Sequence, residues 1–426
     1  MNKKISFYTL GCRLNQSETA SIQNSFEAKG YEVVDFAQPS DIVVINTCTV
    51  TEGGDADTRR LVNKVNRLNP QARIALVGCQ AQVQKEKLAS MPNVRWIVGN
   101  SRKMDLPAVF DEHPQPLTAQ VITPVIEREP FTQAVASVDR QHTRANIKIQ
   151  DGCDFFCSFC EIPYARGRAR SRVFDDILLE ARALSAAGHK EIILTGINIG
   201  TYANEGKSLL DVIKKLETIE ELQRIRISSI EPTTIPVELF DHMGQGKLCR
   251  YLHIPLQSGS DEVLTQMKRK YTAGEFSRFI QNAHHTVPQI CIGTDVIVGF
   301  PSETDKHFDE TVDLIREEPI HYVHVFSYSA RHMAKSRLRQ DTIASHVIKK
   351  RSQILHELSN RKRRMFQESL LGSAQKVLFE NYKNGFWSGV TDNYVRVQVK
   401  SSQDLTNQIL DVQLQSIVGQ NIFGEI

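Results

Sequence analysis

Short apolar runs alternate with amphipathic stretches along the first 125 residues. Four runs are rich in β-forming residues: 5–10, 31–34, 41–46 and 74–77. The stretches 17–28 and 57–68 between them have a helical composition. Strands that alternate with helices favour a parallel sheet with helices on its faces, so we predict an N-terminal doubly wound α/β domain over residues 1–125. Residues 110–140 are typical of an irregular linker because they contain Pro114, Pro116, Pro124 and Pro130.

The same alternation returns further along the chain, at a longer spacing. Strand-like segments begin near Ile147, Ile192, Ile225, Leu252, Ile292 and Tyr322, with helical sequence between them. Six βα units at this spacing predict a (βα) barrel of the TIM type, partial or complete, over residues 140–366. The chemistry of such a barrel lies at the C-terminal ends of its strands.

Residues 367–426 change to a strict alternation of apolar and polar positions. The alternating segments are 375–380, 386–390, 394–400 and 409–414, and turns of Asn, Gly and Ser separate them. This pattern predicts a small closed β-barrel. The fold class is therefore α/β with a terminal β domain.

Composition limits the class of protein. With 41% hydrophobic and 24% charged residues in 426, the chain is an ordinary folded protein. Its apolar runs are shorter than the roughly 18–20 residues that span a bilayer, so we expect a cytoplasmic protein without a membrane partner.

Charge is unevenly placed although the net charge is only +3. Residues 331–366 carry eleven Lys/Arg against two acidic residues, and a compact run of arginines stands at 166, 168, 170 and 172. Both segments suit phosphate binding. The alternatives are a solvated helix face for the long segment and pairing with carboxylates for the compact run.

Three cysteines, Cys153, Cys157 and Cys160, lie within eight residues, directly after the strand predicted at 147–150. Three thiolates on one loop can hold three irons of a [4Fe–4S] cluster and leave the fourth iron open to chelate a small molecule. A structural zinc site usually has four protein ligands, and the nearest histidines in sequence are only His142 and His189. Buried free thiols are the other alternative.

Three further cysteines, Cys12, Cys48 and Cys79, each follow a predicted strand. The C-terminal ends of parallel strands converge on one edge of a sheet, so these thiols could meet in space. Three core cysteines are the alternative. We expect Cys249 and Cys291 to be core residues.

The spacing C-x3-C-x2-C, with Phe159 before the last cysteine, resembles the radical S-adenosylmethionine (SAM) superfamily. Segments at the predicted strand ends strengthen the resemblance and match its methylthiotransferase family: 194–198, 226–232, 253–259 and 294–304. Within that family, residues 11–18, 46–51 and 390–394 are most similar to the tRNA (N6-L-threonylcarbamoyladenosine-C2)-methylthiotransferase branch. That branch adds a methylthio group next to the anticodon, at position 37.

This resemblance implies two [4Fe–4S] clusters, one held by Cys12, Cys48 and Cys79 (the auxiliary triplet) and one held by Cys153, Cys157 and Cys160 (the radical triplet). Gln80 departs from the aromatic or small residue that often follows Cys79 in the family, which leaves the ligand assignment standing. Two SAM molecules are implied, one as methyl donor and one as source of a 5′-deoxyadenosyl radical. SAM contacts are expected from Phe159, Thr195, Gly196, Asn198, Ser228, Glu231, Gln257 and Asp295.

The resemblance also implies a tRNA anticodon stem-loop as substrate and a reductant such as flavodoxin or ferredoxin. Expected tRNA contacts are Arg166, Arg168, Arg170, Arg172, Arg361, Arg363 and Arg364. The same arginine run, 166–172, offers cations for the threonyl carboxylate of the substrate. The last domain resembles a TRAM domain, a small RNA-binding barrel in which aromatic residues stack on bases or form the core. The candidates are Phe386, Trp387 and Tyr394.

Two other substrates remain open within the family: N6-isopentenyladenosine in tRNA and an aspartate of a ribosomal protein. A non-catalytic iron–sulfur or zinc protein that binds RNA is the alternative from another class. Two clusters correspond to about eight irons per chain, which separates the enzyme from a zinc protein. Sequence patterns assign no residue to proton transfer.

Overall fold

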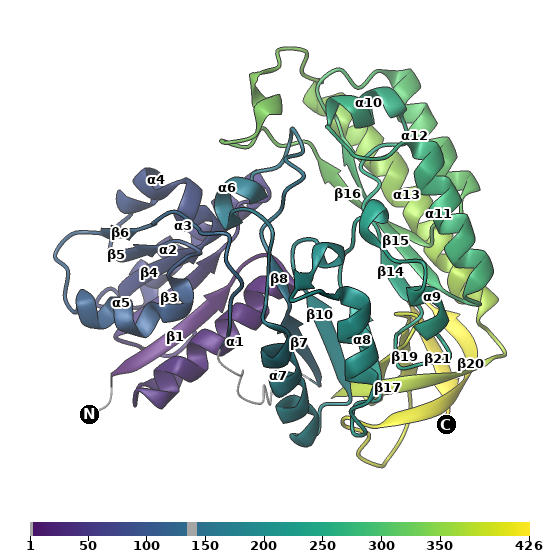
Figure 1. The fold of residues 1–426 in the computed structure, drawn as a ribbon, viewed down its shortest axis with the longest axis horizontal. Helices are drawn as coiled ribbons and strands as arrows, with labels where there is room; N and C mark the ends of the chain where they lie inside the picture. Colours follow the sequence, from purple (N-terminus) through teal and green to yellow (C-terminus); the bar gives the residue numbers. More distant parts are fainter. Residues whose placement is uncertain (1–2, 134–142) are drawn as a thin grey trace.

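The computed structural model describes residues 3–133 and 143–426 and has three parts (Figure 1). An α/β domain lies on the left of Figure 1, a half-open barrel in the centre and a small β-barrel at the lower right. His142, the end of the predicted linker and the predicted start of the central domain at residue 140 lie outside the described residues.

The N-terminal domain is a six-stranded sheet in the order β2-β1-β3-β4-β5-β6, with every pairing parallel. Its strands are β1 (Lys4–Thr9), β2 (Glu32–Val34), β3 (Ile42–Thr47), β4 (Arg73–Gly78), β5 (Val94–Val98) and β6 (Gln120–Ile122). Its helices are α1 (Arg13–Ala28), α2 (Glu52–Leu68), α3 (Cys79–Val83), α4 (Lys85–Ala89), η1 (Lys103–Asp105) and α5 (Leu106–Glu112).

Two separate apolar cores show that helices cover both faces of this sheet. Residues of α1 and α5 join one core and residues of α2 and α4 the other. The predicted doubly wound fold is therefore confirmed. Strands β5 and β6 were not predicted, and β6 lies inside the stretch expected to be an irregular linker. This three-residue strand exists because β5 supplies its hydrogen-bond partners, which local sequence does not reveal.

The central domain has six principal strands that form a partial barrel. They are β7 (Arg144–Lys148), β10 (Glu191–Thr195), β13 (Arg224–Ile227), β14 (Tyr251–His253), β15 (Cys291–Val298) and β16 (Tyr322–Ser327). Parallel pairing gives two three-stranded sheets, β13-β10-β7 and β14-β15-β16. Single parallel bridges, Ile225 with Leu248 and Ser229 with His253, join them. The predicted partial (βα)6 barrel is confirmed.

Helices and short pairs of strands connect the barrel strands. The helices are α6 (Ile162–Arg166), α7 (Phe174–Ala186), α8 (Leu209–Glu217), α9 (Leu239–His242), α10 (Asp261–Gln266), α11 (Ala273–Thr286), α12 (Asp305–Glu317) and α13 (Ser345–Ser369). The minor elements are β8 (Gln150–Asp151), β9 (Arg170–Ser171), β11 (Ala203–Asn204), β12 (Lys207–Ser208), η2 (Ile199–Thr201), η3 (Pro232–Thr234) and η4 (Lys335–Leu338). Helix α13 runs along the outside of the barrel towards the C-terminal domain (Figure 1).

The C-terminal domain is a closed five-stranded barrel in the ring order β17-β18-β19-β21-β20, which agrees with the predicted TRAM-like fold. Its strands are β17 (Ala374–Lys383), β18 (Phe386–Thr391), β19 (Arg396–Val399), β20 (Ile409–Val418) and β21 (Asn421–Glu425). Its core includes Tyr251, Cys291 and Tyr322, the first residues of three central strands. The small barrel therefore closes the N-terminal end of the central barrel, opposite to the end where barrel chemistry lies.

None of the helices within the described ranges combines the length and the apolar character needed to cross a membrane.

Candidate active site

The auxiliary triplet lies at the carboxyl ends of three adjacent strands. Cys12, Cys48 and Cys79 follow β1, β3 and β4, which are neighbours in the sheet. A Cβ atom at Gly11, whose φ is +90°, would lie 2.9 Å from the Cys48 Sγ, so the glycine lets this thiol approach the Cys12 loop. The pKa of the Cys48 thiol is raised to about 11, mainly by burial and in part by the nearby Cys79 and Cys12 thiols. The structure therefore places these three thiols near one another at the strand ends, as the sequence predicted.

Each thiol of the auxiliary triplet also accepts a hydrogen bond. The backbone N–H of Asn15 donates to Cys12 and that of Val50 donates to Cys48. The Nδ2 of Asn100 lies 3.6 Å from the Cys79 Sγ. Donors aimed at the ligand sulfurs are one of the means by which proteins tune iron–sulfur clusters, so these residues fit a three-thiolate cluster site.

The radical triplet lies on the loop between β8 and α6. The Phe155 backbone N–H donates to the Cys153 Sγ at 3.5 Å, and that of Ile162 donates to the Cys160 Sγ at 3.4 Å. Burial raises the pKa of the Cys153 thiol to about 11, while the Phe155 N–H lowers it in part. Three thiols on one loop, two of them with a backbone N–H donor, fit a second cluster.

Arg269, which no local pattern singled out, serves the remaining thiol of the radical triplet. Its Nη1 donates to the Cys157 Sγ at 3.1 Å, and its Nη2 binds the carboxylate of Glu231 and the hydroxyl of Tyr271. Burial raises the pKa of Glu231, and the Arg269 charge opposes that rise. Glu231, an expected SAM contact, is thereby joined to a cysteine of the radical triplet.

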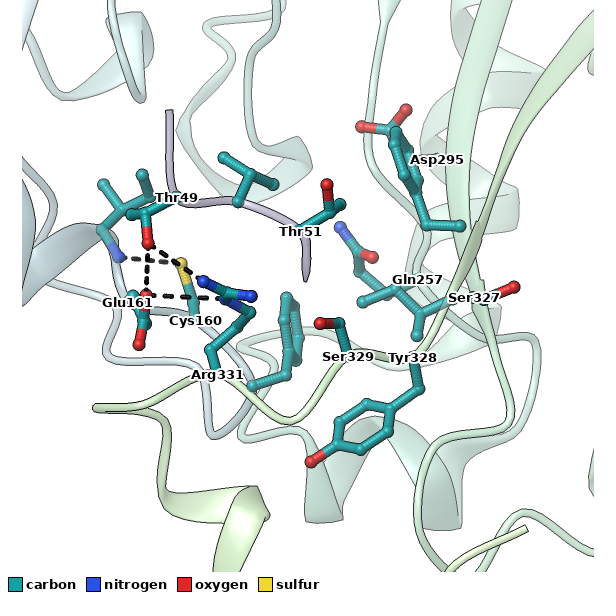
Figure 2. Close-up of a pocket in the computed structure, with 15 residues that line it drawn as sticks. Thr49, Thr51, Cys160, Glu161, Gln257, Asp295, Ser327, Tyr328, Ser329 and Arg331 are labelled. Carbon is teal, nitrogen blue, oxygen red and sulfur yellow. Dashed lines mark hydrogen bonds and ion pairs between the residues drawn. The ribbon is translucent and has the colours of Figure 1, made fainter. Parts of the chain in front are cut away.

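Both cysteine loops border one pocket (Figure 2). Residues 49–51 from the loop after β3 line one side, and residues 159–162 of the radical-triplet loop line another. The rest comes from Gln257, from β15 and from the end of β16 with its following loop. Three of the expected SAM residues, Phe159, Gln257 and Asp295, line it together. The pocket lies at the C-terminal ends of the barrel strands, where (βα) barrels place their active sites.

Asp295 is held as a carboxylate by two histidines. Its Oδ1 lies 2.9 Å from the His253 Nε2 and 3.3 Å from the His324 Nδ1. Burial alone would raise the pKa of Asp295, but these hydrogen bonds and charges hold it below its usual range. The other ring nitrogen of His253 lies 3.0 Å from the Tyr322 hydroxyl, which fixes the imidazole ring.

The remaining expected SAM residues lie at the end of β10 or after β10 and β13, in the other half of the barrel: Thr195, Gly196, Asn198, Ser228 and Glu231. The Asn198 Nδ2 and the Ser228 Oγ are buried and have no hydrogen-bond partner among the described residues. Buried polar groups are nearly always satisfied, so these two atoms fit a polar ligand bound beside the radical triplet.

Two of the arginines expected to bind tRNA are buried in ion pairs, which corrects the prediction for them. The Arg166 side chain is 1% exposed, and its guanidinium group binds Glu18 and Asp151 at 2.9 Å each. Arg172 is equally buried and pairs with Asp176 and Glu180. Pairing with carboxylates, the alternative for this run, therefore applies to both.

The other arginines differ in exposure. Arg168 is exposed beside Asp154, and Arg170 is half-buried at 3.1 Å from Asp151. On α13, Arg361 and Arg364 are exposed, whereas Arg363 lies over the ring of Tyr322. The surface that these arginines offer to phosphate is on α13 and on the loop before β9.

The long basic segment is less positive at the surface than its sequence suggests. Arg331 is buried against Asp55 at 2.8 Å. Arg351 pairs with Glu303 at 2.6 Å and with Asp305 at 2.8 Å. These two cations hold the fold together and are not free to meet a polyanion.

The aromatic residues of the C-terminal barrel divide between core and domain junction. Trp387 belongs to the barrel core, the alternative for this residue, and Phe386 is half-buried against Phe423. Tyr394 packs on Tyr251 at a centroid distance of 4.7 Å, beneath the guanidinium groups of Arg13, Arg144 and Arg226. Cys249 and Cys291 are buried, as expected for core residues.

A buried cluster of charges adjoins the auxiliary triplet. Glu18 accepts hydrogen bonds from Lys103, from Lys148 at 2.7 Å and from Arg166. Four cations meet two carboxylates here: Lys103, Lys148, Arg166 and Arg170 against Glu18 and Asp151. The Arg166 charge acts on the Cys12 and Cys79 thiols. An anionic three-thiolate cluster at this position fits the surplus of positive charge.

Comparison with known proteins decides the family. Residues 147–315 match the Radical SAM superfamily, and residues 4–99 match the uncharacterized protein family UPF0004. Over 422 residues, the chain is 35% identical to the threonylcarbamoyladenosine tRNA methylthiotransferase MtaB of Bacillus subtilis (strain 168). That alignment covers 96% of this chain and 93% of the relative. The chain belongs to the methylthiotransferase family of radical SAM enzymes.

Another relative and a solved structure are also similar to this methylthiotransferase. It is 30% identical over 446 residues to the tRNA-2-methylthio-N(6)-dimethylallyladenosine synthase of Rickettsia rickettsii (strain Sheila Smith), with 100% of both chains covered. Among solved structures, the radical SAM methyltransferase TsrM from Kitasatospora setae matches with a TM-score of 0.57 and 16% identity. That match covers 77% of this chain and 75% of TsrM and concerns the fold alone.

Membership makes this methylthiotransferase an enzyme that uses SAM and [4Fe–4S] clusters, and the non-catalytic alternative no longer applies. Sequence patterns missed several residues that surround its cysteines: Thr49, Glu161, Arg269 and Arg331. Thr49 and Glu161 directly follow Cys48 and Cys160, so adjacency to a ligand was a usable signal. Arg269 and Arg331 come from distant loops, and nothing in their local sequence links them to the cysteines.

Proposed function

We propose that this methylthiotransferase adds a methylthio group to C2 of N6-threonylcarbamoyladenosine at position 37 of tRNA. The pocket between the two cysteine loops carries this proposal, because it provides one space bordered by both triplets' loops. The name of the Bacillus subtilis relative, at 35% identity over nearly the whole chain, supports the substrate.

The auxiliary triplet is proposed to hold one cluster and the radical triplet the SAM-binding cluster. When bound, these groups and SAM supply a 5′-deoxyadenosyl radical and the sulfur to be transferred. The chain itself orients them. Phe159, Gln257 and Asp295 shape the pocket, and Asn198 and Ser228 offer unpartnered polar atoms to SAM. Arg269 holds Cys157 and Glu231 in one network.

We propose three domains: residues 1–125 with the auxiliary triplet, residues 140–366 with the radical triplet, and residues 367–426 as the terminal barrel. Exposed Arg361 and Arg364 on α13 are proposed to contact tRNA phosphates. Arg168, exposed on the loop after α6, is the proposed cation for the threonyl carboxylate. A cytoplasmic location and an electron donor of the flavodoxin or ferredoxin class stay predictions.

Mass spectrometry of tRNA nucleosides tests the proposal, in a strain that lacks the gene, with and without a plasmid copy. We expect 2-methylthio-N6-threonylcarbamoyladenosine to disappear, its unthiolated precursor to accumulate and the plasmid to reverse both changes. Unchanged N6-threonylcarbamoyladenosine derivatives would refute the substrate.

N6-isopentenyladenosine is the second candidate, because the Rickettsia relative, whose name specifies dimethylallyladenosine, is 30% identical over the full chain. Loss of its 2-methylthio derivative in the same strain would establish this candidate. If both nucleosides are unchanged, ribosomal proteins should be examined for a missing methylthio group.

A further inference from the structure

A hydrogen bond joins the two cysteine loops directly. Thr49 follows Cys48 of the auxiliary triplet, and Glu161 follows Cys160 of the radical triplet. The Thr49 Oγ1 donates to the Glu161 Oε2 at 2.8 Å across the boundary between the two domains (Figure 2). Thr49 is 0% exposed and Glu161 is 3% exposed. The bond is therefore shielded from water and connects residues adjacent to one ligand of each cluster.

Arg331 completes this contact from a third segment, the loop after β16. Its Nη2 donates to the Thr49 Oγ1 at 3.1 Å and to the Asp55 Oδ2 at 2.8 Å. Its Nε lies 3.6 Å from the Glu161 Oε2. The second carboxylate oxygen of Glu161 accepts the Met333 backbone N–H at 2.7 Å. Thr49, Glu161 and Arg331, which we call the clamp, thus form a network in which the hydroxyl and both carboxylate oxygens have partners.

Further hydrogen bonds connect the clamp to helix α2 and link the two domains nearby. Asp55 belongs to α2, and it also accepts a hydrogen bond from the Gln84 Nε2 at 2.9 Å. A second link lies nearby, because the Asn100 Nδ2 that approaches Cys79 also donates to the Ala165 carbonyl of α6 at 2.7 Å. Two ligands of the auxiliary triplet are therefore tied to the segment that carries the radical triplet.

Buried polar networks of this kind contribute little net stability but favour one geometry over its alternatives. Methylthio transfer needs that restriction, because the substrate carbon has to meet both the radical source and the sulfur. A misplacement of about 1 Å can cost about 100-fold in rate.

We propose that Thr49, Glu161 and Arg331 are positioning residues that set the distance between the two clusters and so couple SAM cleavage to methylthio transfer. This inference rests on the proposed assignment of the cluster ligands. The clamp side chains line the same pocket and two of them are neighbours of cysteines in the sequence, but none is itself a cysteine of either triplet, so we expect their loss to leave both clusters bound and to affect the coupling more than SAM cleavage.

Thr49→Val tests the proposal, because it removes the hydroxyl and keeps the side-chain shape. The full chain, loaded with both clusters, is incubated with SAM, reductant and precursor tRNA, and three quantities are measured: iron, 5′-deoxyadenosine and methylthiolated nucleoside. We expect unchanged iron, 5′-deoxyadenosine formation within about twofold of wild type and a rise of at least about tenfold in 5′-deoxyadenosine per product. Thr49→Ser, which restores the hydroxyl, should return the ratio to the wild-type value.

A second measurement uses protein without clusters. Amide hydrogen exchange in residues 49–55 and 158–163 should be faster in Thr49→Val than in wild type. Thr391→Val is the matched control, since it removes a buried hydroxyl of the C-terminal barrel. At saturating tRNA it should change neither the ratio nor the exchange of these segments.

A wild-type ratio in Thr49→Val would overturn the clamp, and so would loss of iron or of SAM cleavage. If Thr49→Val does not fold, Glu161→Gln replaces it, because the amide oxygen still accepts from Thr49 while the charge facing Arg331 is gone. The ratio is measured on whichever nucleoside the wild-type enzyme methylthiolates. A wrong substrate therefore shows in the wild-type enzyme, whereas a wrong clamp shows only in the variants.

Discussion

Glu18 is one of the two carboxylates that offset four cations beside the auxiliary triplet, so replacing it should lower the free energy of unfolding considerably. Its carboxylate is 0% exposed and accepts hydrogen bonds from three cationic side chains. These cations outweigh the cost of burial and hold the pKa of Glu18 well below its usual range. In Glu18→Gln, the four cations of this charge cluster would keep only one carboxylate partner, Asp151, among the described residues that form it.

The magnitude follows from the cost of leaving buried charges without a partner. Removing one member of a buried ion pair destabilises a protein by about 3–5 kcal/mol. An exposed pair contributes at most about 1 kcal/mol, so Asp154→Asn, which frees Arg168 and Arg128 at the surface, is the matched control. With a urea dependence of about 2 kcal/mol per molar, Glu18→Gln should lower the unfolding midpoint by roughly 2 M.

Tryptophan fluorescence provides the assay. Of the two tryptophans, Trp96 is fully buried in the N-terminal sheet, so urea unfolding of cluster-free protein in a Trp387→Phe background reports this domain. A midpoint for Glu18→Gln as close to wild type as that of Asp154→Asn would refute the reasoning. A second check is the double variant Glu18→Gln with Lys103→Met. Because the two groups are in contact, the double variant should lose less unfolding free energy than the two single variants lose together. Strict additivity would contradict the electrostatic account.

Three further predictions concern catalysis, pH and tRNA. Cys157→Ala should abolish 5′-deoxyadenosine formation and lower iron from about eight to about four per chain while tRNA binding persists; retained SAM cleavage would contradict the ligand assignment. His321 accepts a backbone N–H through its Nδ1, and burial lowers its pKa to about 3. Between pH 6.5 and pH 3 the unfolded chain therefore binds the extra proton, and stability should fall with falling pH by at most about 1.4 kcal/mol per unit. His321→Asn, which keeps an acceptor but cannot titrate, should remove this part of the slope in urea titrations at each pH, and an unaltered slope would show that His321 is not its source. Replacing Arg361 and Arg364 by Ala should weaken tRNA binding and reduce the salt dependence of log K by up to about 2, in filter-binding assays across a salt series. Arg316→Ala, at an exposed arginine of α12 paired locally, is the control, and an equal effect there would remove α13 as the contact surface.

The alternation of apolar segments was enough to predict the architecture. Strand and helix formation depends on neighbours within a few residues, so the parallel sheet, the six barrel strands and the terminal barrel could be derived in order. Strand β5 has strand-like composition over Val94–Val98 and was a missed local signal. Strand β6 had no such signal, because its three residues are a strand only through their pairing with β5.

The two cysteine triplets also differ in how much their local sequence reveals. The radical triplet lies within eight residues of one loop, so its spacing alone indicates a shared ligand. The auxiliary triplet is brought together from three separate loops, and before the structure only the rule that parallel strands end at one edge and the resemblance to a family linked these cysteines.

By itself, the sequence determined the order of the elements and the candidate ligands of the radical cluster, because both are encoded in local spacing; the candidate ligands of the auxiliary cluster came from the strand-end positions of the cysteines and from the resemblance to a family. Only the tertiary structure decided which charged side chains are buried in ion pairs and which are exposed. Arg166 and Arg331 sit in basic segments typical of phosphate binding, yet each is buried against carboxylates that lie far away in the chain. The bond between Thr49 and Glu161 likewise spans 112 positions. The attraction between two charges grows as their distance shortens, and that distance depends on how whole domains pack.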